Sequence, residues 1–138
     1  MKIFCPIRKI WLESLPEERV RQNIIRCMIS EWGYPPELIS CEKELKELCG
    51  QKGASVPNRR LDIVAFYTQG SELRPLFVIE CKADRMTKAA LRQLVGYNYF
   101  INAPFIGIGT KDGLVCWQKN QEAVQEAPTY SLLTSLIK

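Results

Sequence analysis

The amino-acid sequence predicts an α/β fold in which helices flank a central mixed β-sheet. Three observations support this: five short segments have the apolar pattern of strands, a helical pattern precedes them, and further helical patterns lie between and after them. The chain has 138 residues, of which 46% are hydrophobic and 25% charged, as is usual for one globular domain. No linker or repeat divides the sequence, so residues 1–138 are expected to form a single domain.

The first helix is expected after a short extended arm at residues 1–14. Ser14 can cap this helix, Pro16 suits its first turn, and the two carboxylates that follow favour the positive end of the helix dipole. Its apolar residues have the spacing of one buried face, namely Val20, Ile24, Ile25, Met28 and Ile29. The helix should run to Trp32, because Gly33 and the prolines after it prevent continuation.

Three segments follow that are expected to form strands. Residues 38–45 are a candidate first strand, and residues 46–60 are a polar connection without periodicity. Residues 61–67 have strong strand character, and residues 75–82 form a nearly continuous apolar run, as expected in a sheet covered on both faces. Turn-forming residues 68–71 lie between them, so the last two strands are expected to pair as a β-hairpin.

The remainder of the chain again alternates between helix and strand. A second helix is expected at residues 87–102, although Gly96 weakens it. Residues 105–110 and 114–117 indicate two further strands joined by an Asp-Gly turn. A final helix is expected within residues 121–138. Its buried residues should be Leu132, Leu133, Leu136 and Ile137.

The composition restricts the chemistry. The net charge of +4 is compatible with a polyanionic partner, but many basic proteins bind no nucleic acid. The absence of histidine excludes Ser-His-Asp and Cys-His catalysis, so hydrolysis would need carboxylates, lysine, tyrosine and metal-bound water. Six cysteines without a CxxC pair, no signal peptide and no apolar run near the roughly 20 residues of a membrane span predict a cytoplasmic protein with reduced thiols.

Three charged residues lie in the apolar strands. Asp62 opens one strand, and Glu80 and Lys82, which point to the same face, close the next. Pairing as a hairpin would bring Asp62 near Glu80. Two carboxylates suit Mg²⁺ or Mn²⁺, and Lys82 would then orient a water or stabilise charge on a phosphate. The alternative is a structural ion pair in which Lys82 neutralises one of the carboxylates.

These residues belong to a wider pattern. Asp62, followed after an apolar strand by Glu80-Cys81-Lys82, resembles the PD-(D/E)xK nuclease signature, with Leu61 in place of the proline before the aspartate. Longer segments are similar to the N-terminal nuclease domain of the type I restriction enzyme R subunit, namely residues 17–22, 34–39, 60–64 and 78–83. The resemblance extends from about Leu15 to Trp117 and implies a restriction-endonuclease-like core.

The resemblance implies a metal-dependent DNA endonuclease with Mg²⁺ or Mn²⁺ as cofactor. Asp62, Glu80 and Lys82 would be catalytic, and the two carboxylates would bind the metal. Glu18 in the first helix matches the acidic position that supports the metal site, with Glu17 as the alternative. The other interpretation of Glu18 is a carboxylate that interacts only with the helix dipole.

The resemblance also implies further site residues. Gln93 and Tyr97 match a Gln-xxx-Tyr motif on one helix face, where Gln93 would bond a catalytic group or DNA, and Tyr97 would pack beneath Gln93 or contact a DNA phosphate. The alternative is that Gln93 is a surface glutamine and Tyr97 a core tyrosine. Arg60, Arg85 and Lys88 lie close to the motif strands and are candidate phosphate contacts, while each alone also fits a solvated face.

The resemblance implies DNA as a partner, together with motor or specificity subunits of a restriction system, and it leaves a homodimer open. Type I R subunits continue into motor domains, so the chain is expected to be either a fragment of such a subunit or a free-standing relative. Two other functions stay open. A non-catalytic DNA-binding or assembly module would bind DNA in a salt-sensitive way without turnover, and an adaptor would bind protein alone.

Overall fold

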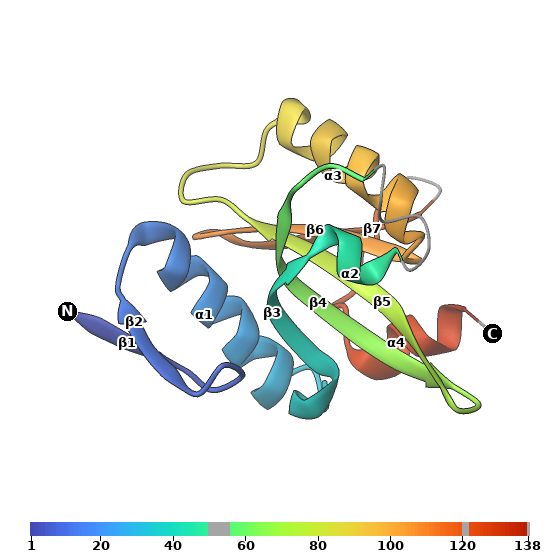
Figure 1. The fold of residues 1–138 in the computed structure, drawn as a ribbon, viewed down its shortest axis with the longest axis horizontal. Coiled ribbons are helices and arrows are strands. Elements are labelled where there is room, and N and C mark those ends of the chain that lie inside the picture. The colour runs from blue at the N-terminus through green and yellow to red at the C-terminus, as the bar shows by residue number, and fades with distance from the viewer. Residues whose placement is uncertain (50–55, 120–121, 138) are drawn as a thin grey trace.

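The computed structural model describes residues 1–49, 56–119 and 122–137, and its centre is a five-stranded β-sheet (Figure 1). The strands are β3 (Ile39–Glu44), β4 (Arg60–Gln69), β5 (Glu72–Cys81), β6 (Phe105–Thr110) and β7 (Gly113–Gln118), in that order across the sheet. Only β5 and β6 are parallel, and helix α3 (Lys88–Ile101) connects them. The expected mixed sheet is therefore confirmed.

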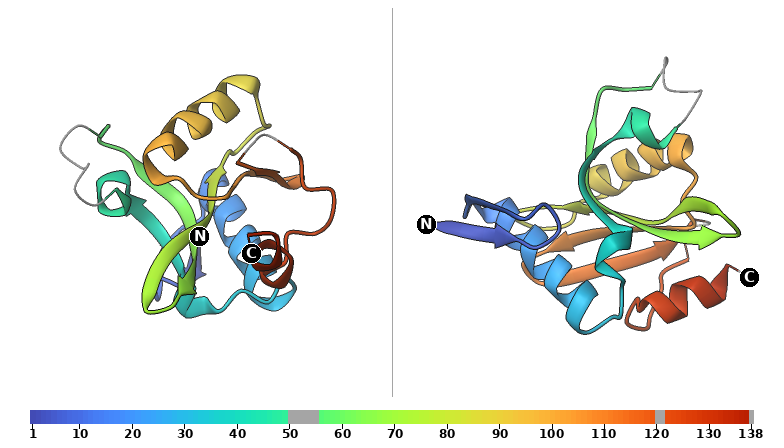
Figure 2. Two further views of the ribbon diagram at one scale, coloured as in Figure 1. Left: turned by 90° about the vertical axis from the view of Figure 1, so that its right-hand side faces the viewer. Right: turned by 60° about the horizontal axis from the view of Figure 1, so that its bottom comes forward.

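Helices cover both faces of this sheet (Figure 2). Helix α1 (Pro16–Ser30) and the short C-terminal helix α4 (Tyr130–Leu136) pack into a core with Ile63 and Ile79. Helix α3 and the four-residue helix α2 (Leu45–Leu48) pack into a second core, on the other face. The apolar strands 61–67 and 75–82 are thus buried on both sides, as their sequence predicts.

The β4–β5 hairpin has a two-residue loop. Gln69 pairs with Glu72, and Gly70 adopts φ of 62° at the first loop position, which is where a type II′ turn requires glycine. The loop fixes the register of both strands. Because β4 and β5 run antiparallel from this loop, Asp62 and Glu80 lie together at the far end of the hairpin.

The structure corrects the N-terminal expectations. Residues 1–14 form a hairpin of β1 (Lys2–Cys5) and β2 (Ile10–Glu13) rather than a single arm. The prediction that Ser14 caps α1 is wrong, because Leu15 occupies the cap position without a side-chain hydrogen bond. The helix ends at Ser30, two residues before Trp32.

Two further segments differ in part from the expectation. Residues 46–60 were expected to be a polar connection without periodicity, and the first of them belong to the four-residue helix α2, where Glu44 and Glu47 form a capping box. Residues 50–55 of that connection lie outside the described residues. The final helix, Tyr130–Leu136, lies within 121–138 as expected, and Leu133 is fully buried, but Leu136 is 45% exposed instead of buried.

The short 3-10 helix η1 (Pro36–Leu38) leads from the end of α1 into β3. None of the helices in the described part of the chain combines the length and apolarity of a membrane span.

Candidate functional site

The ladder between β4 and β5 stops before the strands end, at the pair Ile63 and Ile79. Beyond this pair, hydrogen bonds from backbone N–H groups to side-chain carboxylates replace the backbone–backbone hydrogen bonds of the ladder. The Asp62 N–H donates to Glu80 Oε1 at 3.3 Å, and the Cys81 N–H donates to Asp62 Oδ2 at 2.7 Å. Both carboxylic residues are 6% exposed. The hairpin thus brings Asp62 and Glu80 together in a buried position where the two strands separate.

The sheet is also irregular on the other side of Asp62. The β3 residues on either side of Glu42 pair with β4, but Glu42 itself has φ of 58°. A positive φ is unusual for residues other than glycine and disturbs regular strand pairing. Asp62 therefore lies where both neighbouring strands depart from regular geometry.

Arg21 from α1 is the main charged partner of Asp62. Its Nη2 lies 2.6 Å from Asp62 Oδ1 and 2.6 Å from Glu42 Oε1, and its Nη1 donates to Glu18 Oε1 at 2.8 Å. Burial alone would lower the pKa of the guanidinium, but the charge of Asp62 and the hydrogen bond to it raise the pKa well above its ordinary value. Arg21 therefore stays charged in this buried cluster of carboxylates.

Sequence reasoning did not identify Arg21. One signal was available: Arg21 lies next to Val20 and four residues before Ile25, on the apolar face of α1, where a charge requires a partner. The partners themselves come from strands distant in the sequence, so the signal would have indicated a buried ion pair without naming Asp62.

The pKa of the Glu80 carboxyl is raised to about 8, first by burial and then by the negative charge of Asp62. The hydrogen bond from Asp62 N–H and the positive charges of Arg59 and Lys82 oppose this shift, with Arg59 Nη2 at 3.6 Å from Glu80 Oε2. Burial and the neighbouring charge of Asp62 therefore favour the protonated form of Glu80. A cation bound beside Asp62 and Glu80 would favour the ionised form of both carboxylates.

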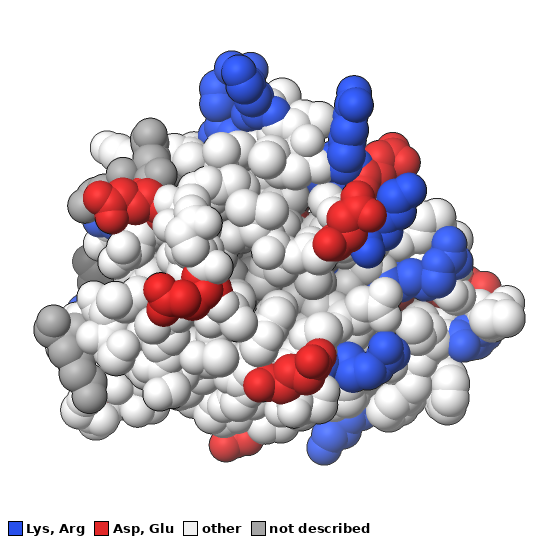
Figure 3. Space-filling view, turned by 180° about the vertical axis from the view of Figure 1, so that it is seen from behind, with Lys and Arg blue, Asp and Glu red and all other residues white. Residues whose placement is uncertain are grey.

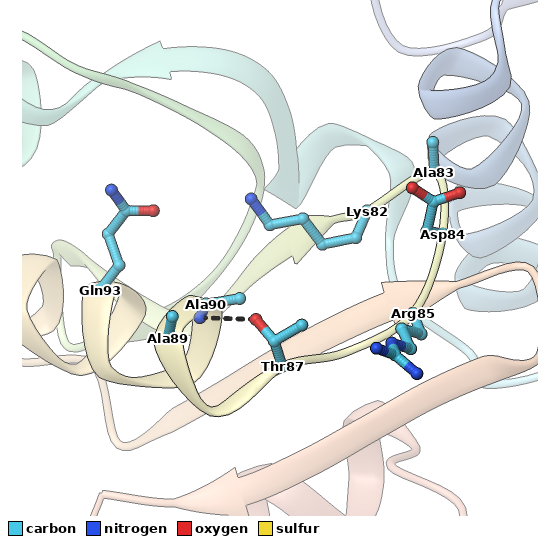
Figure 4. Close-up of a pocket in the computed structure, with 8 residues that line it drawn as sticks. All are labelled: Lys82, Ala83, Asp84, Arg85, Thr87, Ala89, Ala90 and Gln93. Atoms are coloured by element: carbon cyan, nitrogen blue, oxygen red, sulfur yellow. Dashed lines mark hydrogen bonds between the residues drawn. The ribbon is translucent and has the colours of Figure 1, made fainter.

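Lys82 lies one residue beyond β5, and its N–H donates to the Gly109 carbonyl at 2.8 Å. Its side chain lines a cavity of about 470 Å³ between the 82–87 loop and α3. Figure 4 shows the Lys82 ammonium extending toward the side of this cavity where Gln93 projects from α3. Asp62 and Glu80 are not among the residues that line this cavity, whereas Lys82, two residues after Glu80, lines it.

The two candidate glutamates of α1 have different surroundings. Glu18 Oε2 accepts hydrogen bonds from Arg8 at 2.8 Å and Gln22 at 2.9 Å, and its other oxygen accepts from Arg21. Both oxygens of Glu18 are thus occupied by protein donors. Glu18 is an anchor for the two arginines in this structure.

Glu17 faces the site instead. Burial and the negative charge of Asp62 raise the pKa of Glu17, while the positive charges of Arg21 and Lys82 oppose this. These influences place the Glu17 carboxylate near both Asp62 and Lys82, and its side chain remains 53% exposed. Between the alternatives for the helix, Glu17 is the carboxylate with room for another partner.

The four candidate DNA contacts lie in different places. Arg85 lines the same cavity as Lys82, and Lys88 is exposed at the start of α3. Arg60 is exposed at the start of β4, and its Nε lies 4.0 Å from Glu44. Tyr97 is half-buried, and the Arg59 guanidinium lies 5.4 Å from the centre of its ring.

The basic side chains are unevenly distributed. Seen from behind, more of the lysines and arginines lie over the half of the molecule that holds the 82–87 loop, the start of α1 and the N-terminal hairpin (Figure 3). Acidic side chains lie among them. This is the end of the sheet at which Asp62 and Glu80 lie.

Within residues 1–49, 56–119 and 122–137, no group of three or more aspartate, glutamate and cysteine side chains is arranged to hold a metal ion. Asp62 and Glu80 form a pair rather than a set of three. Mg²⁺ commonly binds proteins through one or two carboxylates and completes its shell with water and substrate phosphates. The chemistry of the pair fits that mode of binding.

The family model described as the type I restriction enzyme R protein N terminus matches residues 16–131. The matched span contains Asp62, Glu80, Lys82 and Gln93, and it leaves out the N-terminal hairpin. No curated protein matches the chain.

Proposed function

The chain belongs to the family of the type I restriction enzyme R protein N terminus, and we propose that it is a DNA endonuclease domain of the PD-(D/E)xK superfamily that depends on Mg²⁺ or Mn²⁺. The family supports a role in a restriction-modification system that acts on DNA. Phosphodiester cleavage by residues 1–138 as a single domain is the further step of the proposal. Motor or specificity subunits would be the protein partners.

One observation carries this proposal: Asp62 and Glu80 are joined at the splayed end of a hairpin, and Lys82 follows two residues later beside an open cavity. Asp62 and Glu80 would hold the metal. When bound, Mg²⁺ or Mn²⁺ supplies Lewis-acid polarisation of the scissile phosphate and a more acidic water. The raised pKa of Glu80 supports the fit, because a nearby cation would offset the repulsion between the two carboxylates.

The chain's own residues would divide the remaining tasks. The Lys82 ammonium would stabilise the negative charge that develops on the phosphate, since Lys82 lines the cavity and follows Glu80 by two residues. Gln93, on the same cavity, would hydrogen-bond the phosphate or the attacking water. Glu17 would provide the additional carboxylate that resemblance to the family assigns to the first helix, while Glu18 holds Arg21.

DNA contacts would follow from the basic residues around this cavity. Arg85 lines this cavity, and Lys88 lies at the start of α3. Contacts from these residues to DNA phosphates would fix the position of a DNA strand without recognising its sequence. Arg60 would contact the backbone from the start of β4. Tyr97 would act together with Arg59, which lies over its ring.

The test is cleavage of supercoiled, linear duplex and single-stranded DNA with Mg²⁺, with Mn²⁺ and with a chelator. Asp62→Asn and Lys82→Met should each reduce the rate by about 100-fold or more, since each removes a group that acts on the transition state. The control is Lys119→Met, an exposed lysine at the opposite end of the sheet, which should keep the wild-type rate. A wild-type rate in Asp62→Asn or Lys82→Met would overturn the site assignment.

A second candidate has one observation in its favour. Both oxygens of Asp62 are engaged, one by Arg21 and the other by the Cys81 N–H, as in a site that binds no metal. A non-catalytic DNA-binding module on the same fold would show salt-sensitive DNA binding, no cleavage with either metal and no metal uptake. The same assays therefore separate the two functions.

A further inference from the structure

Arg21 has more carboxylate partners than one guanidinium needs. It lies 2.6 Å from Asp62, 2.6 Å from Glu42 and 2.8 Å from Glu18, with Glu17 at 4.0 Å. The side chain is almost completely buried, so water screens these charges only weakly. Its partners come from three elements, α1, β3 and β4. Arg21 is therefore the positive charge around which this part of the site is assembled.

Arg21 also contacts one of the two Asp62 oxygens that could bind a metal. Oδ2 of Asp62 accepts from the backbone N–H of Cys81, a bond that holds the splayed strands together. Oδ1 is left as the oxygen that can exchange its partner, and Arg21 Nη2 lies 2.6 Å from it. A divalent ion about 2.1 Å from the same oxygen would repel a guanidinium at that distance.

The surroundings of Arg21 allow it to leave Asp62 and remain paired. Its contacts with Glu42 and Glu18 do not involve Asp62. Its Nε is buried without a hydrogen-bond partner among the residues that the structure describes, so the present position does not satisfy the whole guanidinium. A small movement toward Glu42 and Glu18 keeps two of the three short ion pairs.

We propose that Arg21 is a positioning residue that serves as the resident counter-ion of Asp62, and that it releases Asp62 Oδ1 to a divalent metal while staying bound to Glu42 and Glu18. This inference rests on the proposed metal-dependent function. It explains why a site with both Asp62 oxygens engaged can still take a metal. It also means that metal and Arg21 compete for one oxygen, so the wild-type protein binds metal less tightly than a variant without the competitor.

The direct test is calorimetric titration of Mn²⁺ into the full chain. Arg21→Gln should bind Mn²⁺ about 10- to 100-fold more tightly than wild type, the factor that corresponds to one hydrogen bond between charged groups. Arg21→Lys keeps the positive charge but loses the forked guanidinium, whose Nη2 contacts Asp62 and Glu42 and whose Nη1 contacts Glu18, and it should also bind more tightly. Wild-type affinity in both variants would overturn the inference.

Arg59→Gln is the matched control for charge. Arg59 lies 3.6 Å from Glu80 Oε2, so its removal takes one positive charge from the site and leaves the Asp62 pair intact. Its effect on Mn²⁺ affinity should be clearly smaller than that of Arg21→Gln. An equal effect would mean that loss of charge alone explains the result, and the inference would be wrong.

Thermal unfolding gives a second readout that does not depend on activity. Without divalent ions, Arg21→Gln should unfold at a lower temperature than wild type, because its carboxylates lose their counter-ion. Mn²⁺ should then raise the melting temperature of Arg21→Gln more than that of wild type. If Arg21→Gln does not fold, Arg21→Lys carries the comparison, and an equal metal-induced shift in Arg21→Lys and wild type would contradict the inference.

Asp62→Asn separates this inference from the proposed function. If Asp62→Asn abolishes Mn²⁺ binding while the Arg21 variants bind as wild type does, the metal site stands and the role of Arg21 is wrong. If none of the proteins binds Mn²⁺, the proposed metal-dependent function fails, and the role of Arg21 fails with it.

Discussion

Burial and the negative charge of Asp62 both oppose the ionisation of the Glu80 carboxyl. Its folded-state pKa is about 8, against an ordinary value of 4.5. Between these two values the unfolded chain loses this proton and the folded protein keeps it. Folding is therefore favoured less as the pH rises from about 5 to about 8, and the loss stops above the folded-state pKa.

The prediction concerns Glu80→Gln, which removes the ionisation but keeps an oxygen that can accept from the Asp62 N–H. Without divalent ions, the free energy of unfolding of Glu80→Gln relative to wild type should increase by on the order of 2–4 kcal/mol from about pH 5 to about pH 8. Urea denaturation of both proteins at a series of pH values measures this difference. A difference that stays constant with pH would show that Glu80 ionises normally in the folded protein.

At this scale, the sequence predicted the residues that lie within one hairpin. Asp62, Glu80 and Lys82 follow from strand alternation and antiparallel pairing, which are local rules. The interpretation of Arg21 and the distinction between Glu17 and Glu18 depend on how α1 docks against β3 and β4. A helical pattern shows which side is apolar, but the rotation that brings Glu17 toward Asp62 comes from packing between distant segments.

Two glycines test how the elements around the site are packed. Gly96 lies inside α3, where an added Cβ would meet no neighbouring atom within 4 Å, so Gly96→Ala should stabilise the protein by about 0.5–1 kcal/mol through helix propensity. Gly107 in β6 is the opposite case, because a Cβ there would lie 2.8 Å from the Phe77 ring. Gly107→Ala should destabilise by about 1–3 kcal/mol.

Thermal or urea denaturation measures the stability of both alanine variants. Each variant is the control for the other, because the expected changes in stability have opposite signs. Equal signs would contradict the packing described around β6. The expected cause of the Gly107 effect is the close approach to Phe77, which is fully buried in β5, the strand that pairs with β6. Gly107→Ser should be at least as harmful as Gly107→Ala.

The bounds of a helix or strand could be predicted best where its apolar residues repeat regularly over many positions. Strands β4, β5 and β6 and helix α3 have long apolar patterns, and the observed bounds agree with the expected ones within a few residues. Helix α2 has four residues and no room for a period, so it is defined by its capping box instead. Ser14 has the right chemistry for a cap, but its carbonyl and hydroxyl accept from Arg19 instead, and the cap position goes to Leu15.

The whole molecule carries its excess of basic residues unevenly, and this leads to a prediction about DNA binding. Arg85→Ala combined with Lys88→Ala should weaken binding equally on two unrelated duplexes. Because each lost phosphate contact changes the slope of log affinity against log salt by about 0.9, the slope should become shallower by about 2. Fluorescence anisotropy at several salt concentrations measures both quantities.

A variant with the same loss of charge controls for the net charge of the protein. Arg74→Ala combined with Lys119→Ala removes two positive charges at the opposite end of the sheet, where both residues line another cavity. This variant should change the slope little. If the two double variants have equal slopes, the DNA does not bind beside the 82–87 loop.

At the scale of the whole chain, the predicted fold class is confirmed, and the resemblance to the restriction family agrees with the family match over residues 16–131. The paired β1–β2 hairpin was less predictable. Phe4 and Trp11, which pack against each other at 5.2 Å, are 42% and 65% exposed, so the hairpin lacks the alternating burial that identifies a strand. Its position is secured by Arg8, which donates to Glu18 across 10 residues of sequence.

The two-residue loop at Gly70 also has a consequence for the order of folding. A hairpin with so short a loop can nucleate there and zip in one direction, from the pair Gln69–Glu72 to the pair Ile63–Ile79. Asp62 and Glu80 lie just past the last rung, and Arg21, 41 residues earlier in the chain, reaches Asp62 only once α1 has docked. In this order of pairing the two acids are the last part of the hairpin to come together, and the ion pair between Arg21 and Asp62 forms after them.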